Sequence, residues 1–151
     1  MVPTVASNAQ AVSGSYALVK NPSNATADLA LADLMRIYKG DQQFWSSGKK
    51  ITLIVPEPET PEKKVLLDKV YRMSEEEFHG FWLKRVFRGE VLSGPLVLPD
   101  AASTIQFVAS HEGAVGLVNW KNLQGTAAGR SVKILTIDGR SPSEKNYVLS
   151  H

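Results

Sequence analysis

The chain has 151 residues, of which 43% are hydrophobic and 21% are charged, enough for one domain with a buried core but too little for two. The net charge is only +2 and Lys and Arg occur in short pairs, so we expect no nucleic-acid partner. No apolar run reaches the roughly 20 residues of a membrane span. The absence of cysteine excludes disulfides, a thiol nucleophile and Cys-ligated metals.

Residues 1–14 are rich in Ala, Ser, Asn and Val, and we expect a flexible leader there, followed by a single α/β domain over 15–151. The leader has no apolar core of the kind that signal peptides carry. The protein is therefore either cytoplasmic or an exported protein whose signal peptide has been removed.

The first half of the chain alternates short apolar runs with amphipathic spacing. Residues 16–19 predict a buried strand, which ends at Asn21-Pro22. A helix is expected from Leu29 to the helix-ending Gly40, with Asp28 as its cap. Residues 51–55 predict a second buried strand.

Three capping patterns mark the helices that follow. Thr60 before Pro61 predicts a helix start with proline in the first turn, and Ser74 followed by Glu77 has the spacing of a capping box. Asp100 caps a third expected helix. Residues 91–99, between the last two helices, are expected to form a loop.

The C-terminal part contains two more strand patterns and a possible edge strand. Residues 114–118 and 132–137 are apolar and bounded by turn residues, and 147–149 can add a terminal edge strand. Gly113 is expected to take a positive φ angle after the preceding helix, and Gly116 to allow a close approach inside its strand. Strands separated by helices predict an α/β fold with a mixed, mostly parallel sheet flanked by helices.

Three segments in order resemble one known family. They are residues 21–55, with Ile37-Tyr38-Lys39-Gly40 and Trp45; residues 81–95, with Phe81-Trp82 and Phe87-Arg88-Gly89; and residues 108–118, with Gly113-Ala114-Val115-Gly116. Together they resemble the phosphate-type substrate-binding proteins of bacterial ABC transporters, in particular short single-lobe relatives. Glu112 stands where the family has proline, and Leu117 where it has tyrosine. The resemblance implies one lobe of a type 2 periplasmic binding protein, located in the periplasm or outside the cell.

The segments that hold the anion in this family differ here. In the family, turns rich in Ser, Thr and Gly lead into helix N-termini, whose N–H groups and dipole hold phosphate. Here Asn21-Pro22-Ser23-Asn24 follows the first strand, and residues 56–61 after the second contain three prolines and two glutamates. Proline removes N–H donors and carboxylates repel an anion, so tight phosphate binding is not expected.

The sequence contains no pattern typical of a catalytic or metal site. No Gly-x-Ser-x-Gly elbow or phosphate-binding loop is present, and His79, His111 and His151 lack ligand spacing. We therefore expect no catalytic residue, no metal and no cofactor, and no enzyme.

Two functions remain open for this chain. The first is a non-enzymatic, exported accessory or interaction module, with a protein partner or self-association and a weak small-anion ligand. The second is a genuine periplasmic carrier of phosphate or another oxyanion, for which the candidate ligand-binding residues are Asn21, Ser23 and Thr60, with Trp45 as a cleft wall. Trp45 can also simply cover the edge of the core.

Overall fold

The computed structural model describes residues 14–124 and 126–150. All but one of the residues of the expected leader lie outside this part. Six strands form one sheet in the order β2–β6–β1–β5–β3–β4. Their bounds are Tyr16–Lys20 (β1), Asp28–Leu29 (β2), Thr52–Pro56 (β3), Leu96–Leu98 (β4), Ala114–Asn119 (β5) and Lys133–Ile137 (β6).

The sheet is mixed and mostly parallel, as predicted. β3 runs parallel to both β4 and β5, and β2 parallel to β6, while β1 runs antiparallel to its neighbours β5 and β6. The helices are Leu31–Tyr38 (α2), Pro61–Val65 (α3), Glu75–Phe87 (α4) and Ala101–Ser110 (α5), with a π-helical turn at Leu66–Tyr71 (η1) and 3-10 turns at Trp120–Asn122 (η2) and Ala128–Ser131 (η3).

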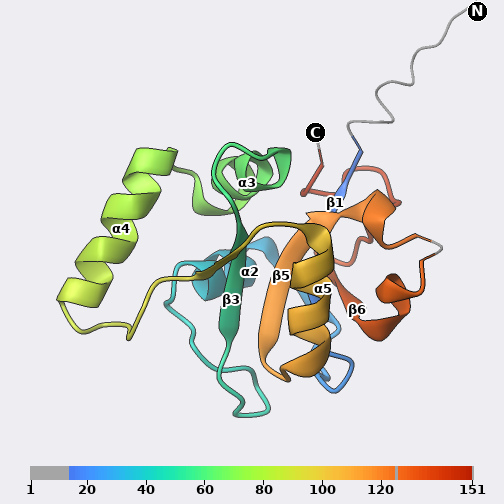
Figure 1. The fold of residues 1–151 in the computed structure, drawn as a ribbon, viewed down its shortest axis with the longest axis horizontal. Coiled ribbons are helices and arrows are strands. Elements are labelled where there is room, and N and C mark those ends of the chain that lie inside the picture. Colours follow the sequence, from blue (N-terminus) through green and yellow to red (C-terminus); the bar gives the residue numbers. More distant parts are fainter. Residues whose placement is uncertain (1–13, 125, 151) are drawn as a thin grey trace, which may run out of the picture.

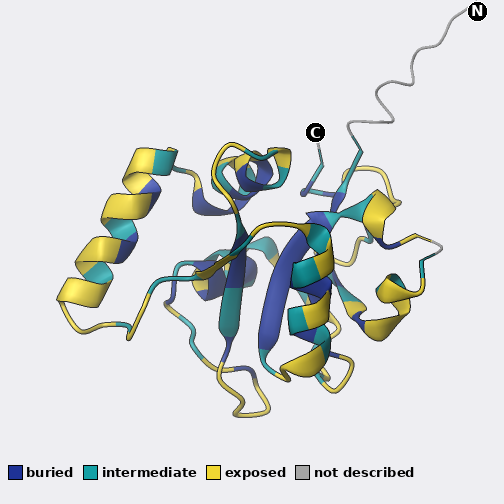
Figure 2. Ribbon diagram, in the orientation of Figure 1, coloured by how far each residue is buried: buried dark blue, intermediate teal, exposed yellow. Residues whose placement is uncertain are grey.

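Helices cover both faces of the sheet, and β1 shows how the core is divided between them. Leu18 belongs to the larger apolar cluster, which lies under α2, η1 and the first half of α4. Ala17 and Val19, which point the other way, belong to the smaller cluster under α5. In Figure 1, α5 stands in front of β5, and α4 stands apart from the sheet at one end of the molecule. Figure 2 shows the matching burial, with the central strands buried and one side of α4 exposed along its length.

The capping patterns correctly predicted three helix starts. The Thr60 hydroxyl accepts a hydrogen bond from the Lys63 N–H at the start of α3. Ser74 and Asp100 each form a capping box, at α4 and α5 respectively. These motifs are local, so the sequence is sufficient to predict them.

The predicted cap at Asp28 is wrong. Asp28 lies in β2, and its carboxylate accepts hydrogen bonds from the Thr136 hydroxyl and the Gly139 N–H. The residue before α2 is Ala30, which supplies no side-chain cap. Instead, Asp138, after β6, accepts from the Leu31 N–H at 3.1 Å. A distant loop thus caps α2, a contact that sequence spacing does not reveal.

Two strand predictions also need correction. The expected loop 91–99 contains β4, which has only three residues between Pro95 and Pro99. Proline signals are typical of loops, but an edge strand tolerates them because one side of its ladder is unpaired. The expected strand over 147–149 is not part of the sheet; the Leu149 carbonyl accepts the Tyr16 N–H, and Ser150 forms an isolated bridge with Ser15.

All four tyrosines of the chain are buried. The Tyr71 hydroxyl donates to the Tyr38 carbonyl at 2.6 Å, and the Tyr147 hydroxyl donates to the Tyr16 carbonyl at 2.8 Å. Burial raises the pKa of each of these phenols above its usual value, and at Tyr71 well above it. Above about pH 10, the folded protein therefore keeps phenolic protons that the unfolded chain releases.

This difference predicts a loss of stability at alkaline pH. A group whose pKa is raised by folding stabilises the protein fully below its unfolded pKa, about 10 for tyrosine, and the stability falls as the pH rises above that value. We expect the urea midpoint to stay level up to about pH 9 and to fall increasingly as the pH rises above about 10. The Tyr147→Phe variant should show a shallower fall. A midpoint that stays constant over this range would contradict the prediction.

Candidate functional site

A hollow of about 470 Å³ opens at the carboxyl ends of β3 and β4. In open sheets with parallel strands, ligands bind outside the carboxyl ends of the strands, so this is the candidate site. α3 and α5 both start here, and η2 closes the side after β5. The hollow is lined by Pro56, Thr60, Glu62, Leu98, Pro99, Asp100, Ala101, Ala102, Thr104, Leu117, Val118 and Asn122.

Thr60 reaches this hollow, but its hydroxyl is already engaged. It accepts the Lys63 N–H at 3.1 Å and donates its own hydrogen to the Glu57 carbonyl at 2.8 Å. A hydroxyl has a single hydrogen to donate, so Thr60 offers none to an anion in this arrangement. Pro61, the first residue of α3, has no N–H at all.

The start of α5 is occupied by its own carboxylate. Asp100 accepts the Ser103 N–H at 2.8 Å, in the position where the helix end attracts negative charge. This backbone hydrogen bond, followed by one from the Ser103 side chain, lowers the pKa of Asp100. Asp100 therefore carries its negative charge at neutral pH beside the hollow.

Glu62 adds a second negative charge at the same edge. Burial, and after it the Glu62 charge, raise the pKa of Tyr16, which begins the neighbouring strand β1. Asn122 also lines the hollow. Two carboxylates, an amide and an engaged hydroxyl favour a cationic or hydrogen-bond-donating group over an oxyanion.

Asn21 and Ser23 lie at the other end of the sheet. β1 is antiparallel to β5, and Lys20 at its end pairs with Val115 near the start of β5. The buried Asn21 amide donates to the carbonyl of Val108 at 2.9 Å, so it holds the last turn of α5. Its oxygen accepts from both the N–H and the hydroxyl of Ser23. Asn21 thus caps the C-terminus of α5 and forms a turn with Ser23, and both residues lie at the end of the sheet opposite Thr60.

Trp45 lies at the same end of the sheet as Asn21. Its side chain is 4% exposed, and its indole N–H donates to the Gly113 carbonyl at 2.9 Å. Trp45 therefore covers the edge of the core and is not the wall of a cleft at the candidate site. The structure thus does not bring the four candidate residues together, and only Thr60 lies at the candidate site.

Sequence patterns alone do not place Glu62, Asp100 and Asn122 in one site. They predict Asp100 as a helix cap, but they predict a loop where the strand before it lies. Had β4 been recognised as parallel to β3, the rule that ligands bind at the carboxyl ends of strands would have placed Asp100 beside Thr60. Asn122 follows β5 in a 3-10 turn and carries no sequence signal of its own.

A second hollow, of about 460 Å³, lies between α4 and the start of β3 and β4. Trp82 and Leu96 are among its apolar lining residues, and Gln42 and Lys50 are among its polar ones. Within the described residues, no group of three or more His, Asp or Glu side chains is placed to hold a metal ion. No helix in this part of the chain is both long and apolar enough to cross a membrane.

Comparisons with known proteins agree on the fold. No protein-family model and no curated protein matches the sequence. Among solved structures, an ABC-type phosphate transport receptor from Vibrio cholerae is similar over 90% of this chain and 53% of its own, with 19% identity and a TM-score of 0.69. The chain has the fold of half a phosphate-type substrate-binding protein.

Two further substrate-binding proteins support this assignment. PstS from Borrelia burgdorferi matches 99% of this chain and 62% of its own at 12% identity, with a TM-score of 0.69. A putative phosphate ABC transporter substrate-binding protein with bound phosphate, from Clostridium perfringens, matches 85% and 46% at 17% identity, with a TM-score of 0.65. The chain spans about half to three-fifths of the length of these proteins. At such identities, the likeness shows the substrate-binding-protein fold and not the ligand.

Proposed function

We propose that this protein is a non-enzymatic interaction module, built on a single substrate-binding lobe, that does not hold phosphate tightly. The observation that carries the proposal is the Asp100 carboxylate, which occupies the N-terminus of α5 in the candidate site. Export to the periplasm or beyond, as part of a transport or sensory system, is the setting that the fold suggests.

The electrostatics of the hollow support this proposal. An oxyanion placed there meets the negative charges of Glu62 and Asp100, and the Ser103 N–H that would bind it already donates to Asp100. A bound anion must gain hydrogen bonds to replace those it loses from water. One lobe also buries only part of a small ligand, whereas ligand sites usually bury most of the ligand surface.

Calorimetric titration with phosphate, sulfate and molybdate tests the proposal. We expect no binding of any of the three anions to the wild-type protein at micromolar affinity. Binding of one anion per chain at micromolar affinity would overturn the interaction role and establish the protein as a carrier.

A variant at the candidate site tests whether the negative charges of Glu62 and Asp100 prevent anion binding. Asp100→Ser keeps a residue that caps helices well, and Glu62→Gln keeps the size of the side chain, so the double variant should fold while losing both charges. We expect sulfate to bind this variant more tightly than the wild type. Asp68→Asn with Glu112→Gln, which removes two exposed charges outside the hollow, is the matched control. An equal change in both variants would show that total charge, and not the site, governs affinity.

Genuine anion transport is the second candidate function. It is favoured by the Clostridium perfringens structure, which holds phosphate, and by two N–H groups, of Ala101 and Ala102, in the first turn of α5 beside the hollow. The same titration decides between the two candidates.

A further inference from the structure

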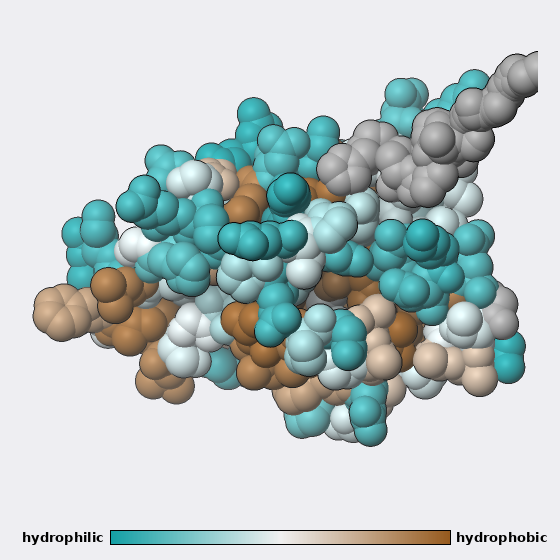
Figure 3. Space-filling view, turned by 45° about the horizontal axis from the view of Figure 1, so that its top comes forward, coloured by the Kyte–Doolittle hydropathy of each residue, from teal (hydrophilic) through white to brown (hydrophobic). Residues whose placement is uncertain are grey.

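The outward face of α4 carries large apolar side chains that the fold leaves exposed. The inner face holds the buried Phe78 and Trp82. On the opposite face, Leu83 is 71% exposed and Phe87 is 91% exposed. Figure 3 shows hydrophobic side chains gathered at the end of the molecule where α4 lies. An exposed apolar patch of this kind marks an interaction surface.

A glycine sits in the middle of this outward face. Glu76, Gly80, Leu83 and Phe87 follow the spacing i, i+4, i+7 and i+11, so they form one stripe along the helix. A Cβ atom added at Gly80 would meet nothing within 4 Å, so the folded chain has no need of glycine there. Glycine in a helix interior costs about 1 kcal/mol relative to alanine. The helix backbone at this position is therefore open to close approach by another molecule.

The charges of α4 are arranged so that the helix complements itself. Its first turn carries the exposed Glu76 and Glu77, and its last turns carry the exposed Lys84 and Arg88. Glu75 and Arg85 are instead engaged within the fold, with Lys63 and with Asp41 and Glu90 respectively. Two copies packed antiparallel bring the acidic end of each helix to the basic end of the other. Such reciprocal pairing is what a two-fold symmetric interface requires.

We propose that the outward face of α4 is a homodimer interface, in which two copies of α4 pack antiparallel. With the two-fold axis midway between positions 83 and 84, Phe87 of each copy lies over Gly80 of the other, because the two residues are equally far from the axis on either side. The Arg88 guanidinium then comes within reach of the partner helix's first turn, where Glu76 lies on the contact face. This inference does not depend on whether the candidate site binds an anion.

Sedimentation velocity over about 10 μM to about 1 mM, which brackets weak association, tests the proposal. We expect the wild type to form dimers as its concentration rises. Phe87→Ser removes the aromatic ring that packs over the partner's Gly80, and Gly80→Gln fills the space that this ring occupies. Each substitution should raise the dimer dissociation constant at least about tenfold. Both positions are exposed, so folding should be retained, which circular dichroism verifies. The control Leu92→Ser changes a side chain that is also exposed, at 88%, but lies beyond the helix.

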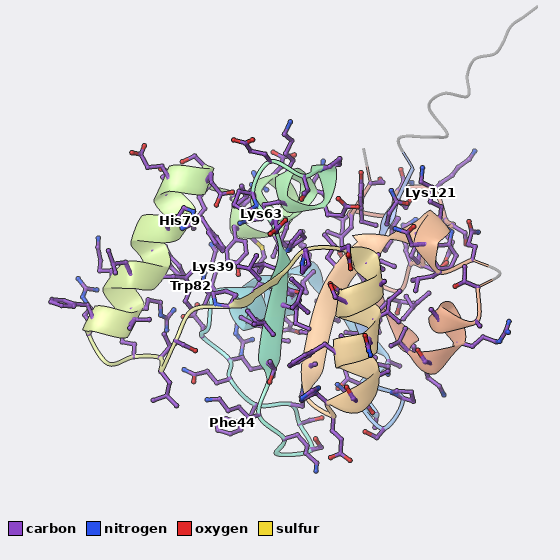
Figure 4. All side chains as sticks on the ribbon, in the orientation of Figure 1. Lys39, Phe44, Lys63, His79, Trp82 and Lys121 are labelled. Carbon is purple, nitrogen blue, oxygen red and sulfur yellow. The ribbon has the colours of Figure 1, made fainter. Side chains whose placement is uncertain are left out.

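A charge exchange tests the antiparallel arrangement. Glu76→Lys and Arg88→Glu should each weaken the dimer several-fold, and the double variant should recover most of the affinity. Glu77 is unsuitable because its carboxylate accepts the Ser74 N–H in the capping box. Because the chain has no cysteine, Leu83→Cys gives a single thiol near the axis. It should form an intermolecular disulfide under mild oxidation, and Lys121→Cys, which Figure 4 places on the opposite side of the molecule, should not.

The outcomes are decisive in either direction. A wild type that stays monomeric at every concentration overturns the proposal, and so does a dimer that Phe87→Ser and Gly80→Gln leave unchanged. A monomer that binds anionic lipid vesicles would assign the same apolar stripe to a membrane surface, and the homodimer would then be wrong. Concentration-dependent dimers that are lost in both variants and restored by the charge exchange establish the interface.

Discussion

Replacing Gly113 with alanine should destabilise the protein by about 3 kcal/mol or more, because the new methyl group has no room. A Cβ atom at this position would lie 1.9 Å from the Lys50 carbonyl oxygen, which belongs to the backbone and cannot turn aside. The Gly113 carbonyl also accepts the Thr52 N–H at 3.0 Å and the Trp45 indole N–H at 2.9 Å. Any shift that relieves the clash therefore disturbs the junction of β3 and β5.

Urea unfolding at low protein concentration measures this effect. Gly80→Ala is the matched control, since it makes the same chemical change in a helix with open space around it. We expect this control to stabilise the monomer by up to about 1 kcal/mol. If Gly113→Ala unfolds at the wild-type midpoint, the close approach of the Lys50 carbonyl is wrong.

Removal of the Glu75 carboxylate should be the second most damaging change, because it leaves a buried ammonium group without its charge partner. The Lys63 side chain is 1% exposed, and its Nζ lies 3.1 Å from a Glu75 oxygen and 4.1 Å from the centre of the Phe78 ring. Glu75 is one-third exposed and also pairs with His79, so solvent screens part of the interaction. We expect Glu75→Ala to cost about 1 to 3 kcal/mol.

The partner substitution should be far milder. Lys63→Met removes the buried charge together with its need for a partner, and methionine fills a similar volume beside Phe78, so we expect a change within about 1 kcal/mol. Glu76→Ala, in the same first turn but without a buried partner, measures the loss of a favourable helix-end charge. The result that contradicts this account is Lys63→Met costing as much as Glu75→Ala.

The corrected role of Gly113 illustrates the limit of sequence patterns. Its place after an expected helix predicts a positive φ angle, because glycine often ends a helix. The positive φ angles of the described glycines lie at Gly14, Gly40, Gly48, Gly89 and Gly139, and α5 ends at the extended His111. Gly113 instead permits the approach of β3. Gly116 was correctly expected to mark a close approach, which the Thr104 side chain of α5 makes.

The sequence by itself determined the local features of this protein. Strand β1, the caps at Thr60, Ser74 and Asp100, and the α/β class follow from residues within a few positions of one another, because apolar period and capping are local properties. The expected absence of tight oxyanion binding rests on residues 56–61 and stays a prediction, although the engaged Thr60 hydroxyl supports it.

Only the tertiary structure decided which residues share a site. Asn21 and Thr60 each follow a strand, but β1 and β3 run in opposite directions, so the two residues lie at opposite ends of the sheet. Asp100 lies beside Thr60 because the three-residue strand β4 pairs in parallel with β3. Strand direction depends on pairing between distant segments, and no pattern within one segment encodes it.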